Sequence, residues 1–103
     1  MYEEDELTDK ERKRQERIQQ RRYNDVNKVM SIPEGRRVIW DILCSCGIYR
    51  SSYSENCNQM AMLEGRRQVG LELLTEIDSN HKELSIKMQR EYLALKKQEE
   101  KGE

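Results

Sequence analysis

The sequence predicts an all-α fold, a small helical hairpin core flanked by long charged helices. Four of the five glycines, the only proline and the only tryptophan lie between Pro33 and Gly70, so nothing interrupts a helix over long stretches on either side. Within that block, apolar residues recur at spacings of three and four, which is typical of helices. Because 38% of the residues are charged and only 35% are hydrophobic, the core must be small. We therefore expect partner chains to supply part of the stability.

The first helix is expected at residues 9–30, since Thr8 and Glu11 have the spacing of a capping box. Apolar residues enter this helix only toward its end, at Ile18, Val26, Val29 and Met30. Residues 1–31 should therefore form a charged arm whose beginning projects and whose end docks.

Charge is unevenly distributed along this arm. Residues 1–7 hold four acids and no bases, whereas residues 10–22 have a local net charge of +5. The seven bases of the second segment are Lys10, Arg12, Lys13, Arg14, Arg17, Arg21 and Arg22. Such a helix either contacts phosphates, with salt-dependent affinity, or is simply solvated or faces protein. No aromatic residues are interleaved with the bases as in many nucleic-acid-binding segments.

Residues 32–78 should form the hairpin core. Ser31 can cap its first helix, Pro33 fits the first turn, and Gly47 ends the helix. A loop follows, and the second helix should begin near Ser54 or Glu55. Gly65 and Gly70 inside this helix suggest close approach of the other helix, with Trp40 over the gap. The expected core positions are Val38, Ile39, Trp40, Ile42, Leu43, Gly65, Val69, Gly70, Leu73 and Leu74.

Residues 79–103 should form a charged C-terminal helix. Asn80 and Glu83 offer a cap that would break the chain here, but one continuous helix to about Gln98 is an equal alternative. An apolar stripe through this segment comprises Ile77, Leu84, Met88 and Leu95. The stripe indicates a partner-binding helix or a bundle seam.

No catalytic, metal or cofactor site is predicted. Cys44 and Cys46 are separated by one residue rather than the two that are common in zinc knuckles. These two cysteines and the third, Cys57, are therefore expected to be small buried residues. The lone His81 has no neighbouring nucleophile in a recognisable arrangement, which argues against an enzyme.

The tetrad Glu-Gly-Arg-Arg occurs at residues 34–37 and again at residues 64–67. Its arginines are candidates for ion pairs across the hairpin or a subunit interface, because guanidinium binds carboxylates bidentately. These arginines are Arg36, Arg37, Arg66 and Arg67. Gly35 is expected in the first turn of a helix and Gly65 well inside one, so the repeated tetrad is interpreted as coincidence rather than as an internal duplication.

The order of motifs from Arg36 to Gly70 resembles a family of small tailed-phage proteins encoded among the head and tail structural genes of podoviruses. The motifs are Arg36-Arg37, Ile39-Trp40-Asp41-Ile42-Leu43, Cys46-Gly47-Ile48-Tyr49, Ser51-Ser52-Tyr53, Glu64-Gly65-Arg66-Arg67 and Val69-Gly70. The resemblance implies a non-enzymatic virion-associated structural, assembly or DNA-ejection role, and it does not reach residues 1–31 or the segment after Ile77. Its expected partners are portal, tail or internal virion proteins, in multiple symmetric copies.

The alternative is a DNA-binding packaging or regulatory adaptor that uses residues 10–22, or an isolated interaction module. No apolar run is long enough to span a bilayer, and residues 1–7 are acidic where a signal peptide needs bases. We therefore expect synthesis in the bacterial host cytoplasm and a final location in the virion.

Overall fold

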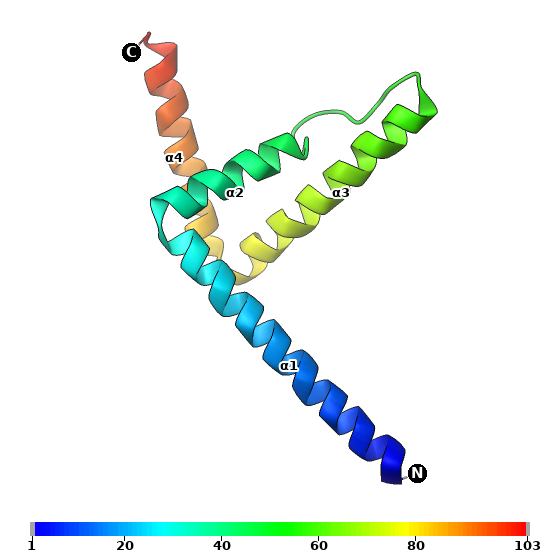
Figure 1. Cartoon of the computed structure of the whole chain (residues 1–103). Coiled ribbons are helices and arrows are strands. Elements are labelled where there is room, and N and C mark those ends of the chain that lie inside the picture. Colours follow the sequence, from blue (N-terminus) through cyan, green and yellow to red (C-terminus); the bar gives the residue numbers. More distant parts are fainter. Residues whose placement is uncertain (1, 103) are drawn as a thin grey trace.

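The computed structural model of the chain describes the backbone of residues 2–102 and the side chains of residues 8–102. Over this range the fold is all-α, with no strand. Its four helices are α1 (Tyr2–Ser31), α2 (Pro33–Ser45), α3 (Cys57–Asn80) and α4 (Lys82–Glu100). Helices α2 and α3 lie side by side as a hairpin, while α1 and α4 extend away from its base toward opposite ends of the molecule (Figure 1). The predicted fold class is thereby confirmed.

Helix α1 is longer than the sequence pattern predicts. It begins at Tyr2, so Thr8 lies inside it and does not start it. Every residue from 8 to 25 is exposed, whereas Val26 is half-buried and Met30 is fully buried. The arm therefore projects over its first part, contacts the rest of the fold at Arg22 and Tyr23, and is buried at Met30. The side chains of the acidic segment 1–7 lie outside the described residues.

A tight corner joins α1 to α2. Ile32 is extended (φ −111°, ψ 143°) and precedes Pro33, which favours that conformation. The predicted cap by Ser31 is wrong, because the Ser31 hydroxyl donates back to the Asn27 carbonyl inside α1. A Cβ on Gly35 would lie 1.8 Å from the Val29 carbonyl oxygen, so only glycine fits here.

The connection from α2 to α3 also differs in detail from prediction. Helix α2 ends where predicted, with Gly47 in the left-handed conformation (φ +76°) that allows the chain to turn. Ile48 then folds back into the core. Helix α3 begins later than Ser54 or Glu55, because Asn56 caps it by accepting a hydrogen bond of 3.0 Å from the Gln59 amide.

A sharp break separates α3 from α4, as the first of the two alternatives proposed. The non-helical residue is His81 (φ −138°, ψ 48°), and Asn80 remains the last residue of α3 rather than capping α4. The Ser85 hydroxyl donates to the Asp78 carboxylate across the corner. The Tyr23 ring of α1 packs on the His81 ring with centroids 4.6 Å apart. The corner is thus held by a hydrogen bond between α3 and α4 and by a ring contact from α1.

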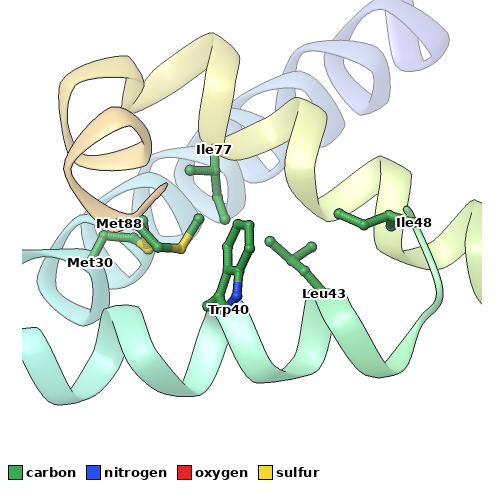
Figure 2. Close-up of a cluster of buried hydrophobic side chains, with 6 residues drawn as sticks. All are labelled: Met30, Trp40, Leu43, Ile48, Ile77 and Met88. Carbon is green, nitrogen blue, oxygen red and sulfur yellow. The ribbon is translucent and has the colours of Figure 1, made fainter. Parts of the chain in front are cut away.

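The core lies where all four helices meet. Trp40 stands at its centre between Ile77 and Leu43, with two methionines on one side and Ile48 on the other (Figure 2). The buried cluster consists of Met30, Trp40, Leu43, Ile48, Ile77 and Met88. It therefore takes one side chain from α1 and one from α4, and is not confined to residues 32–78.

Several predicted core positions are not buried. Val38, Ile42 and Val69 have exposed fractions of 56%, 43% and 62%. The buried face of α2 instead contains Gly35, Arg36, Trp40 and Leu43. Trp40, Leu43 and Gly70 are buried as predicted, and the residues half-buried against the core are Ile39, Leu73 and Leu74.

The two glycines of α3 have different surroundings. A Cβ on Gly70 would lie 2.6 Å from the Cys46 Cβ and 2.7 Å from the Ile48 Cγ2. Gly65 has nothing within 4 Å of the same position. The close approach predicted for both glycines therefore occurs at Gly70 alone, and Cys46 with Ile48 fills it rather than Trp40.

Two ion pairs connect helices that are far apart in sequence. Arg22 of α1 holds both carboxylate oxygens of Glu76 in α3, each at 2.8 Å. Arg36 of α2, whose side chain is only 4% exposed, pairs with Glu91 of α4 and donates at 2.9 Å to the Met30 carbonyl of α1. These bonds hold the pKa of both carboxyl groups below the ordinary value.

The glycine pair predicts opposite effects of one substitution. Gly70→Ala should lower the free energy of unfolding by about 1–3 kcal/mol, because the new methyl overlaps tightly packed atoms. Gly65→Ala should raise it by about 0.5–1 kcal/mol, since alanine restricts the unfolded chain and meets open space. Urea denaturation followed by circular dichroism measures both. Equal effects would contradict the assigned close approach.

The Arg22–Glu76 pair predicts a pH dependence. Its carboxyl pKa is lower in the folded than in the unfolded chain, so the pair stabilises the fold above the unfolded value of 4.5 and this contribution is lost as pH falls through the folded value. Arg22→Gln should make the free energy of unfolding less dependent on pH in this acidic range, as measured by denaturant titrations. Arg12→Gln, which removes only a local pair with Asp9, is the control and should leave the dependence unchanged.

Candidate partner-binding surfaces

An aromatic cleft opens between α2, α4 and the turn after α2. Its volume is about 750 Å³. The residues that line it are Trp40, Cys44, Ser45, Tyr49, Arg50, Gln89, Tyr92 and Leu93. Helical geometry explains the arrangement, because Trp40 and Cys44 are one turn apart on α2, as are Gln89 and Leu93 on α4.

Aromatic rings form one wall of this cleft. Trp40 packs against Tyr92 with ring centroids 4.6 Å apart and against Tyr49 at 5.8 Å. The buried Trp40 indole nitrogen has no hydrogen-bond acceptor among the described residues, so Trp40 acts through packing. Tyr49 and Leu93 remain 63% and 55% exposed. The cleft therefore presents apolar surface that a partner's side chains can cover.

One positive charge stands at the cleft. Arg50 is the charged member of its lining and donates to the Cys44 carbonyl at 3.3 Å. A guanidinium has five N–H donors, so further donors can meet an acidic group. Partial burial raises the pKa of the Tyr49 hydroxyl above its ordinary value.

Sequence patterns did not single out this cleft. Tyr49 occurs among them only within a motif of the family resemblance, and Arg50, Tyr92 and Leu93 are not among the predicted site residues. A signal existed for Tyr92, because Ser85, Met88 and Tyr92 continue one face of α4 at helical spacing.

A second surface is the outer face of α1. At 100° per residue, five of its seven bases fall within an arc of about 100°. We call this surface the basic ridge, and its members are Lys10, Lys13, Arg14, Arg17 and Arg21. Val26 and Met30, which dock α1, lie on the opposite face. Arg12 and Arg22 lie outside this arc, and they pair with Asp9 and Glu76.

The arginines of the repeated tetrad do not act alike. Arg36 is buried and pairs within the chain with Glu91 of α4. Arg37 and Arg67 form local pairs with Glu34 and Glu64, and Arg66 is exposed on α3. Arg36 therefore belongs to the fold rather than to an interface.

The cysteines are only partly buried. Cys44 and Cys46 are half-buried against the core, whereas Cys57 is exposed, contrary to prediction. In the described part of the chain, no three His, Cys, Asp or Glu side chains group closely enough to hold a metal ion. No helix among the described residues is both long and apolar enough to cross a membrane.

The helices and surfaces define an all-α protein built around a small four-helix junction. The family model described as Bbp19-like phage protein matches residues 26–90, well over half of the chain. The chain belongs to this family of phage proteins. The match extends beyond the resemblance found in the sequence, since it includes the docked end of α1 and the first half of α4. No match was found among curated proteins or solved structures.

Trp40→Ala should lower the free energy of unfolding by about 3–5 kcal/mol, because it empties the centre of the core and removes one wall of the cleft. Val38→Ala on the same helix should change it by less than about 0.5 kcal/mol, since Val38 is exposed. Chemical denaturation of the two variants measures the difference. A near-neutral Trp40→Ala would remove the central role assigned to this side chain.

Proposed function

We propose that this phage protein is a virion-associated structural or assembly component of a podovirus, without enzymatic activity. It packs through helical contacts against portal, tail or internal virion proteins, and also serves during assembly or DNA ejection. Several symmetric copies sit in the particle after synthesis in the host cytoplasm.

The observation that carries this proposal is the extended shape of the chain. Its radius of gyration is 18.8 Å and its principal extents are 68 × 39 × 16 Å. A compact chain of about 100 residues has a radius of gyration of about 13 Å. A body 16 Å thick cannot enclose a large core, so much of its apolar surface remains for a partner to bury.

The aromatic cleft is the proposed docking point. Its occupant is an amphipathic helix of another virion protein, because apolar side chains match Tyr49 and Leu93 while an acidic side chain beside them meets Arg50. The exposed ends, residues 8–25 and 93–102, extend beyond the cleft and add contacts on either side.

Leu93→Lys should therefore reduce the number of copies per particle, because it places a charge in the cleft without removing a buried side chain. Leu95→Lys is a matched control on the same helix, at 49% exposure and outside the cleft lining. Tyr49→Ala and Tyr53→Ala form a second matched pair. Quantitative mass spectrometry of purified phage carrying each variant gives the copy number.

Three results would count against the proposal. Absence of the wild-type chain from purified particles would overturn the virion location. Equal incorporation of the Leu93 and Leu95 variants would overturn the cleft as docking point. Purified chain that dimerises by analytical ultracentrifugation, and fails to do so as Leu93→Lys, would assign the cleft to a second copy instead. Comparing full with emptied particles separates an ejected from a permanent component.

A further inference from the structure

The basic ridge is a concentration of positive charge that the tertiary contacts of the described residues do not use. The residues involved are exposed and lie in the part of α1 that projects away from the other helices (Figure 1). Arg14 has a single local partner, Glu11, at 4.0 Å and largely exposed. Between residues 8 and 24 no acidic side chain falls within the arc of the ridge. Like charges gathered in this way repel one another unless an anion lies against them.

We propose that the basic ridge of α1 binds the phosphate backbone of double-stranded DNA, without reading its sequence. This activity goes beyond the virion role and does not depend on it. Arg and Lys side chains are the usual phosphate-contacting groups, and these contacts carry no sequence information.

The shape of α1 fits this ligand. Lys10 and Arg21 are about 16 Å apart along the helix axis, over which duplex DNA presents about ten phosphate charges. A single helix that is not covered by other elements is about 10–12 Å wide, side chains included, and the major groove of B-DNA is about 12 Å wide. The deep, narrow major groove of A-form RNA does not admit such a helix.

An acidic protein is a weaker candidate for this face. Stable protein interfaces depend on a few desolvated apolar or aromatic anchors, and the ridge arc from Lys10 to Arg21 contains none. The apolar residue of this segment, Ile18, lies outside the arc. Phosphate binding needs no such anchor.

The test is fluorescence anisotropy of the full chain with a labelled DNA duplex of about 20 base pairs, at salt from about 50 to 200 mM. Five phosphate contacts give a slope of log affinity against log salt of about −4.5, or about 500-fold weaker binding across this range. Arg14→Gln/Arg17→Gln/Arg21→Gln should reduce this change to about tenfold, because about two contacts remain. Glutamine preserves the helix.

Arg66→Gln/Lys97→Gln/Lys101→Gln is the matched control, with the same charge change at exposed sites away from the ridge. It should keep the wild-type slope. An equal loss in the control, binding to duplex RNA as tight as to DNA, or no binding at about 50 mM salt would each overturn the proposal. If the ridge variant lowers incorporation into particles while the wild type binds no DNA, the ridge faces an acidic protein, which also overturns it.

Discussion

The guanidinium of Arg36 holds three helices in one arrangement. It is rooted in α2, donates to the Met30 carbonyl at the end of α1, and pairs with Glu91 in α4. A buried cation without these partners would destabilise the fold strongly, so α1 and α4 must both converge on α2 at this depth. The Met30 side chain meanwhile enters the core from the same backbone position. This polar contact on one side and the small apolar cluster on the other therefore both contribute to the directions of the two arms.

Much of the helical framework could be predicted because its signals are local. Gly47 ends α2, and the polar run before His81 permits the break between α3 and α4. The buried face of α2 could not be predicted in the same way. Val38 and Ile42 are more apolar than Arg36, yet Arg36 is the residue that is buried. Its burial depends on the ion pair with Glu91, which lies 55 residues later in the sequence. The local pattern of apolar residues cannot indicate so distant a partner. It therefore predicts a buried face of α2 that includes Val38 and Ile42 instead of Arg36.

The two candidate surfaces also differ in how far the sequence predicts them. The basic ridge follows from helical periodicity once α1 is known to be a helix, and only the position of the docked face had to come from tertiary structure. The aromatic cleft gathers side chains from α2, the following turn and α4, so no single segment predicts it. Membership in the Bbp19-like phage family covers residues 26–90, which include most of the cleft lining but not Tyr92 and Leu93, and only the docked end of α1. The ridge is accordingly a property of this chain that lies outside the family match.

The opposite directions of α1 and α4 have a mechanical consequence. Because the arms leave the junction on different sides, a single chain spans the longest dimension of the molecule, 68 Å (Figure 1). The two arms of one copy can thus contact two separate bodies that do not touch each other. The arms join the hairpin at the corner around His81 and at the pair of the buried Arg36 with Glu91, so a force on either arm would act on these contacts.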